Sequence, residues 1–200
     1  MVDDINRTYW LLNDLEGYAK EVLVSKGQGT NKGVDVSLEK FFTKGIFMIS
    51  SFSIFSSNFK PVSGISYSTR FNSNTSGSLT GAKEWNFKNN KVFQLGWKLV
   101  YNGGLPLTPL AARPPNTHEP ALDEAHPFSA RIPSYFRIDN RLALRKDKAK
   151  ISWQLALDIQ NILGIKNTDG LNWKYDPSVN QWVYRTQSGL VPVLSYQIDF

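Results

Sequence analysis

The sequence predicts an all-β protein of about eight antiparallel strands, because apolar and polar residues alternate regularly along much of it. In KVFQLGWKLVY (91–101), an apolar or aromatic side chain takes every second position from Phe93 to Tyr101. YFRIDNRLALR (135–145) and ISWQLALDIQN (151–161) repeat this pattern. Successive side chains of a strand point to opposite faces, so the alternation indicates strands with one apolar and one polar face.

Five further strands and their connections complete this predicted architecture. Val34, Val36 and Leu38 share one face of a strand over 34–42, and weaker patterns place the others at 20–26, 46–58, 66–75 and 191–200. Tight polar turns are expected at 43–45 and 146–149, with a moderate connection over 77–90 on the same side. The opposite side carries 27–32, 59–65 and two long loops, 104–133 and 164–189, the first rich in proline and the second containing a hairpin around 176–180. Residues 1–17 form a poorly defined N-terminal segment, and 18–200 form the strand region.

Composition excludes several classes of protein. The net charge of +6 comes from basic residues that are scattered along the chain, so we expect no nucleic-acid binding. No segment has the roughly 18 consecutive apolar residues of a membrane-spanning helix. The chain has no cysteine, which excludes disulfides and thiolate chemistry. Its polar start, MVDDINRTYW, is unlike a secretory signal peptide, so an envelope protein with this sequence would lack its export signal here.

Alternation alone fits both a membrane barrel and a soluble barrel or sandwich, because each has one apolar face. Three features favour the membrane barrel. The expected strands are long enough for a tilted bilayer crossing. The row Arg137, Asp139, Arg141 and Arg145 is strongly polar, as a hydrated lumen allows. Aromatic residues gather near the predicted strand ends, as in interfacial girdles; these are Tyr101, Tyr135, Trp173, Trp182 and Tyr184. We therefore predict an antiparallel up-and-down transmembrane β-barrel portion.

The last segment, VPVLSYQIDF, places Leu194 and the predicted barrel-assembly signal Tyr196, Ile198 and Phe200 on one face. This pattern resembles the C-terminal strand of outer-membrane proteins, which the barrel assembly machinery recognises. A strand that ends in phenylalanine by chance is the alternative.

Six segments, in chain order, resemble TonB-dependent outer-membrane receptors, in particular the type with an N-terminal carboxypeptidase-regulatory-like domain. They are SKGQGTNKGVDVSLEK (25–40), SLTGAKEW (78–85), YNGGLPLTP (101–109), YFRIDNRLAL (135–144), LALDIQNILG (155–164) and GLVPVLSYQIDF (189–200). The resemblance implies a bacterial outer-membrane location, contact with lipid, and a barrel of about 22 strands that surrounds a plug. It also implies uptake of a siderophore, cobalamin or glycan.

Family barrels end in the periplasm, so the resemblance places the tight turns there and both long loops outside the cell. We expect this chain to match about the last eight strands and to form an open, incomplete barrel that is not transport-competent alone. Its partners would be the N-terminal barrel strands and plug of the same receptor, and the TonB complex only through that missing part. The alternatives are a self-contained small outer-membrane barrel with a structural or adhesion role, and a soluble β-barrel that binds apolar ligands.

The candidate sites are few. His118 and His126, with Glu119, Asp123 and Glu124, could hold a metal ion, but the surrounding prolines favour a solvated loop, and we expect neither metal nor cofactor. The arginine row could bind an anionic ligand or face a plug. Asn161 is expected in a turn, and Gly103–Gly104 where the chain leaves the barrel. No nucleophile, carboxylate pair or phosphate loop has a recognisable spacing, so we do not expect an enzyme.

Overall fold

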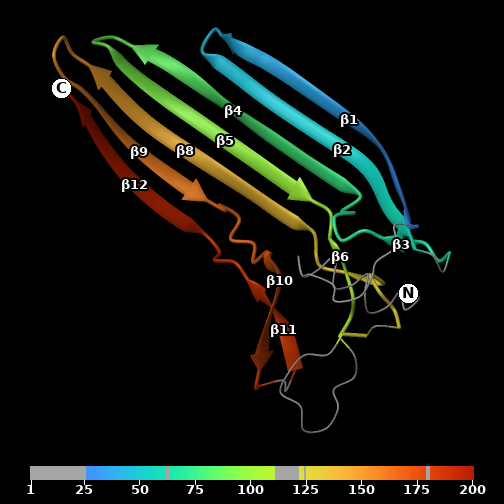
Figure 1. Cartoon of the computed structure of the whole chain (residues 1–200). Helices are drawn as coiled ribbons and strands as arrows, with labels where there is room; N and C mark the ends of the chain where they lie inside the picture. The colour runs from blue at the N-terminus through green and yellow to red at the C-terminus, as the bar shows by residue number, and fades with distance from the viewer. Residues whose placement is uncertain (1–25, 62–63, 111–121, 124, 179–180) are drawn as a thin grey trace.

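The structure is a computed structural model that describes residues 26–61, 64–110, 122–123, 125–178 and 181–200. Its main feature is one antiparallel eight-stranded sheet, drawn in Figure 1 as a row of long diagonal strands. Seven strands follow one another across it: β1 (Gln28–Thr43), β2 (Ile46–Lys60), β4 (Thr75–Phe87), β5 (Lys91–Asn102), β8 (Tyr135–Asp147), β9 (Ser152–Gln160) and β12 (Val191–Asp199). The eighth, β3 (Tyr67–Ser68), pairs only with the outer part of β2.

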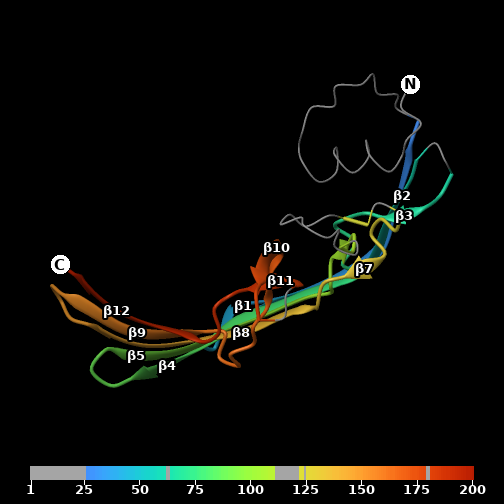
Figure 2. The same ribbon diagram turned by 90° about the horizontal axis from the view of Figure 1, so that it is seen from below.

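The sheet is open. Strand β1 pairs only with β2, and β12 pairs only with β9, so the described strands leave two free edges. Figure 2 shows the sheet edge-on as a single curved layer. The predicted all-β, open antiparallel fold is therefore confirmed.

Connections of two lengths alternate along this path. Short turns join β1 to β2, β4 to β5 and β8 to β9, all at the same end of the sheet in Figure 1, and the C-terminus lies at that end too. Lys44–Gly45 and Asn89–Asn90 have positive φ at both residues, which is the geometry of the hairpin turn whose twist matches that of its strands. The long connections 61–74, 103–134 and 161–190 all begin and end at the opposite end.

Two small sheets are built within the long connections. Strands β6 (Pro106–Leu107) and β7 (Ala130–Arg131) pair at the end of the main sheet. Strands β10 (Thr168–Asp176) and β11 (Gln181–Thr186) form the predicted hairpin, which projects beyond the main sheet in Figure 1.

The structure corrects the predicted position of one strand. The segment 66–75 contains only the two-residue β3 and the first residue of β4, whereas 77–90, predicted as a connection, is mostly the 13-residue strand β4. The first eight residues of β4, TSGSLTGA, are mostly small and include two glycines, so this part of the sequence favours a strand weakly. Pairing with both β2 and β5 supplies the missing stabilisation. In addition, β1 begins at Gln28, inside the predicted loop 27–32, and β2 extends to Lys60. The predicted strand at 20–26 lies outside the described residues except for Lys26.

Two buried asparagines redirect the chain where it leaves β9. Asn161 has a φ of 51°, and its backbone N–H donates to the Asp139 carboxylate at 2.8 Å. The Asn167 side chain accepts from the Phe136 N–H at 3.0 Å and donates to the Phe136 carbonyl at 2.9 Å. The amide thereby takes the place of a neighbouring strand at the outer end of β8, because it satisfies both backbone groups there.

No helix among the described residues is long and apolar enough to cross a membrane.

Candidate functional site

The sheet has an apolar face that the described residues leave uncovered. Cross-strand pairing and alternation place the following side chains on this face: Val34, Val36, Leu38, Met48, Phe52, Ile54, Leu79, Trp85, Phe93, Leu95, Trp97, Leu99, Phe136, Ile138, Leu142, Leu144, Trp153, Leu155, Leu157, Ile159, Leu194, Tyr196 and Ile198. Val34 is 67% exposed and Leu194 is 71% exposed, at opposite edges of the sheet. A water-soluble domain buries such a face against a second layer, so this surface is the candidate contact surface for an apolar environment.

Few side chains are buried within the described part of the chain. The buried apolar residues are Val92, Leu107, Ile132, Ala143 and Ala156, with Pro61 and Pro106. Three of these, Pro106, Leu107 and Ile132, lie around β6 and β7 rather than on the main sheet's apolar face. The main sheet is therefore held together by its backbone hydrogen bonds and by neighbouring side chains on each face.

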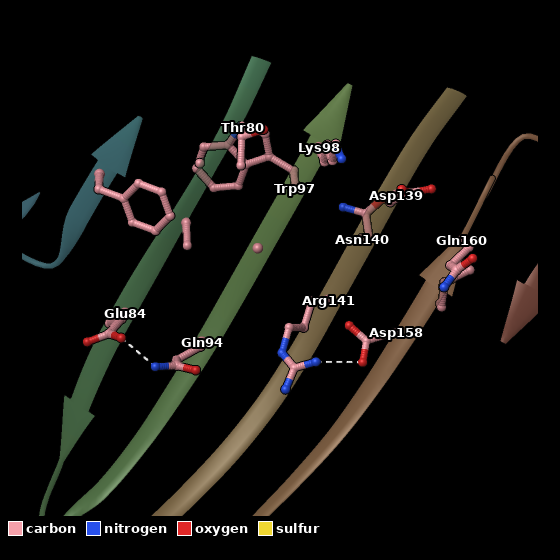
Figure 3. Close-up of a pocket in the computed structure, with 15 residues that line it drawn as sticks. Thr80, Glu84, Gln94, Trp97, Lys98, Asp139, Asn140, Arg141, Asp158 and Gln160 are labelled. Atoms are coloured by element: carbon pink, nitrogen blue, oxygen red, sulfur yellow. Dashed lines mark hydrogen bonds and ion pairs between the residues drawn. The ribbon is translucent and has the colours of Figure 1, made fainter. Parts of the chain in front are cut away.

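The opposite, polar face carries the predicted row Arg137, Asp139, Arg141 and Arg145 on β8. The Arg141 guanidinium donates to the Asp158 carboxylate on β9 at 2.6 Å, and Arg137 Nε donates to Asp139 at 2.6 Å. Arg145 Nε lies 3.2 Å from Asp147. Gln94 on β5 donates to Glu84 on β4. Figure 3 shows the Glu84–Gln94 and Arg141–Asp158 contacts as dashed lines between neighbouring strands.

A shallow depression of about 430 Å³ lies along this part of the sheet. Its charged lining residues are Glu84, Lys98, Asp139, Arg141 and Asp158, and Phe47 also lines it. Because Arg137, Arg141 and Arg145 each have a carboxylate neighbour, the polar face offers a mixed surface of hydrogen-bonding groups and not a concentrated site for one anion.

The Arg141–Asp158 ion pair should contribute little stability. Its side chains are 43% and 29% exposed, so water screens the attraction. In a double-mutant cycle with Arg141→Met and Asp158→Asn, we expect a coupling energy of about 0.2–1 kcal/mol in the free energy of unfolding. A coupling energy above about 2 kcal/mol would instead indicate a desolvated pair in a closed environment.

At the long-loop end of the sheet, one arginine connects two of the three long connections, 61–74 and 103–134. Arg131 Nη1 donates to the carbonyl oxygens of Asn72 and Gly104, each at 2.7 Å, and Nη2 donates to the Asn74 side chain at 3.1 Å. Sequence reasoning missed this residue, because its acceptors are backbone carbonyls that only the folded loops bring together.

The other predicted site residues lie on the sheet or in the loops. Tyr196 and Ile198 project from the apolar face of β12, a free edge, and Phe200 follows that strand. In the proline-rich loop, His126 Nδ1 lies 2.8 Å from Asp123 Oδ2, and this contact holds the pKa of Asp123 below its usual value. His118, Glu119 and Glu124 lie outside the described residues. Among the residues that are described, no cluster of three metal-ligating side chains occurs.

Comparison with known proteins adds no family to this description: no protein-family model, no curated protein and no solved structure matches the chain.

Proposed function

We propose that this chain forms part of the wall of a bacterial outer-membrane β-barrel, with its apolar face toward lipid and its polar face toward a hydrated lumen. The observation that carries the proposal is the single-layered sheet whose apolar face is exposed from one edge to the other. Lipid would satisfy that face without a second protein layer. The separation of short turns from long connections at opposite ends has the asymmetry of such barrels.

The strand directions support a partial barrel completed by further strands. With seven strands in antiparallel order, β1 and β12 run in the same direction, so they cannot close the sheet by pairing antiparallel with each other. An up-and-down barrel needs an odd number of additional strands between them. A self-contained eight-stranded barrel would need one such strand, and only residues outside the described part of the chain could supply it.

Within this class we propose a receptor of the TonB-dependent type, which takes up a scarce nutrient such as a siderophore, cobalamin or glycan. The support is the ordered set of sequence segments that resemble those receptors. In this proposal the remaining strands and the plug bind the nutrient together with this wall and couple it to the TonB complex. Tyr196, Ile198 and Phe200 on the terminal strand would present the chain to the barrel assembly machinery. The self-contained barrel remains the second candidate, and the long loops favour an adhesion role for it.

Tryptophan quenching tests the membrane orientation. Trp97 lies on the apolar face midway along β5, whereas Trp182 lies on β11 in the projecting hairpin. Two variants, each with one of these as its only tryptophan, are folded into phosphatidylcholine vesicles. We expect lipids brominated in the middle of the acyl chain to quench Trp97 strongly and Trp182 hardly at all.

One result would contradict the membrane proposal. If the chain is monodisperse in buffer without detergent, and brominated lipid leaves Trp97 unquenched, the apolar face is covered by protein and the membrane proposal is wrong. The soluble barrel that binds apolar ligands would then be the better description.

A further inference from the structure

The charged residues of the apolar face are all lysines and all lie near strand ends. Lys32 and Lys60 lie toward the long-loop end, and Lys40, Lys83, Lys91 and Lys146 lie toward the short-turn end. No aspartate, glutamate or arginine of the seven long strands projects from this face. The short turns add Lys44, Lys88, Lys148 and Lys150. We call these eight lysines of the short-turn end the lysine rim.

At the centre of the lysine rim, two lysines face each other directly. Lys91 on β5 is the cross-strand partner of Lys146 on β8, so both side chains leave the apolar face side by side. Their β-carbons are about 5 Å apart at such positions, and like charges placed there repel. The other cross-strand neighbours are Phe87 beside Lys91 and Trp153 beside Lys146, and neither can neutralise a charge. The pair would therefore be stabilised by an anion bound between the two ammonium groups.

The acidic residues of the same end do not serve this purpose. Glu39, Glu84, Asp147 and Asp199 alternate onto the polar face. Asp147 is paired there with Arg145, and Asp199 accepts hydrogen bonds from Gln197. Among the described residues, no ion pair involves a lysine of the rim. The positive charge of the rim is thus left for a partner outside this part of the chain.

Aromatic side chains border the lysine rim on its apolar side. The rings of Trp85 and Phe93 lie 5.6 Å apart, and those of Trp153 and Tyr196 lie 6.5 Å apart. Lys83 extends from the apolar face past the Trp85 ring, at 5.8 Å, to donate to the Lys44 carbonyl in the turn at 2.9 Å. A lysine that bends its charge away from apolar surface toward the strand end follows the pattern of side chains at a membrane–water interface.

We propose that the lysine rim binds the headgroup phosphates of anionic phospholipids, with Lys91 and Lys146 as the central site. This inference rests on the proposed membrane function, since it places the rim at the headgroup level of one leaflet. The apolar band beside the rim would hold the acyl chains of the same lipid. An acidic soluble protein would match the charge of the rim but not the adjoining apolar and aromatic band. Each lysine near a membrane surface favours anionic lipid about fivefold, so a pair gives a measurable preference.

The test measures how strongly spin-labelled phosphatidylglycerol associates with the chain relative to spin-labelled phosphatidylcholine. The full chain is folded into phosphatidylcholine vesicles that contain either label. We expect phosphatidylglycerol to be preferred about threefold or more at low salt, and less at high salt because added ions screen the charges. In the Lys91→Gln/Lys146→Gln variant the preference should fall by at least half because the central site is lost, and the six remaining rim lysines should sustain the rest. The matched control, Lys32→Gln/Lys60→Gln, removes two lysines from the same face at the other end and should keep most of it.

The possible results of this experiment test the lysine-rim proposal and the membrane proposal separately. Equal association of the two lipids with the unchanged chain, or equal losses in the two double variants, would overturn the lysine-rim proposal and leave the membrane proposal intact. Loss of the preference on adding inorganic phosphate at constant ionic strength would show that the site takes free phosphate and not a lipid headgroup. Failure to insert into any vesicle would contradict the membrane proposal itself, and the lysine rim with it.

Discussion

Replacing Phe52 by arginine is expected to weaken folding into lipid bilayers by about 2–4 kcal/mol, or roughly 30- to 1000-fold in the equilibrium constant. Phe52 is 46% exposed on the apolar face, and its ring covers the backbone at Gly77, where an added β-carbon would lie 3.3 Å from it. It is six residues from Ile46, where β2 begins after the turn, hence about 20 Å along the strand. With a tilt of about 45°, this position falls near the middle of a hydrocarbon layer about 30 Å thick.

The neighbouring residue gives the control for this prediction. Ser53 projects from the other face of the same strand, where its cross-strand neighbours are Asp35 and Ser76. Ser53→Arg adds the same charge one residue away, and we expect a change within about 0.5 kcal/mol because the site is hydrated and adjoins a carboxylate. Both values come from urea titration of the chain in phosphatidylcholine vesicles. Equal penalties for the two variants would mean that the two faces do not differ in their access to water.

The sequence predicts the two faces of the sheet well because alternation is a local property. Apolar and polar residues alternate within each of the segments 91–101, 135–145 and 151–161. Cross-strand pairing then places the apolar residues of all three strands on one face of the sheet. The strand β4 shows where this reasoning fails. Its glycines lie beneath aromatic rings of the neighbouring strands, Gly81 under Trp97 and Gly77 under Phe52. Those contacts favour a strand, but they depend on the register of three strands, which no single segment encodes.

The candidate site on the polar face is likewise predictable from the sequence only in part. That Arg137, Asp139 and Arg141 share one face follows from their spacing alone. That Asp158 meets Arg141 depends on the offset between β8 and β9, which the turn after Asp147 sets. The lysine rim also could not be predicted without the register of the strands. Lys91 and Lys146 are far apart in sequence and become neighbours only through β5–β8 pairing.

The glycine pair after β5 was predicted at the right place but for a different reason. Backbone angles that only glycine tolerates were expected at Gly103–Gly104, yet neither residue has a positive φ. A β-carbon on Gly103 would lie 2.0 Å from the Ser73 carbonyl oxygen, and one on Gly104 would lie 1.9 Å from that of Ile132. The requirement for glycine is therefore the close approach of the backbone at 103–104 to Ser73 in the connection 61–74 and to Ile132 further along the connection 103–134.

Gly104→Ala is accordingly expected to disrupt the long-loop end of the sheet, at a cost of about 3 kcal/mol or more. The added methyl would force the backbone away from Ile132, and with it the Ile132 N–H that donates to Leu105 at 3.0 Å. It would also move the Gly104 carbonyl that accepts from Arg131. Because these contacts hold β6 and β7 and do not pair the long strands, the loss should be local. We expect rapid proteolysis within 103–134 while the main sheet keeps its circular dichroism.

Gly29→Ala is the matched control, since no atom lies within 4 Å of the position that its β-carbon would occupy. Gly29 is an exposed residue of β1, and alanine there should leave stability and proteolysis unchanged to within about 0.5 kcal/mol. A protected 103–134 segment in Gly104→Ala would show that the two loops can separate without loss of order, and that Arg131 alone is sufficient to hold them. Unfolding of the whole sheet would show instead that the loop junction and the long strands form one cooperative unit.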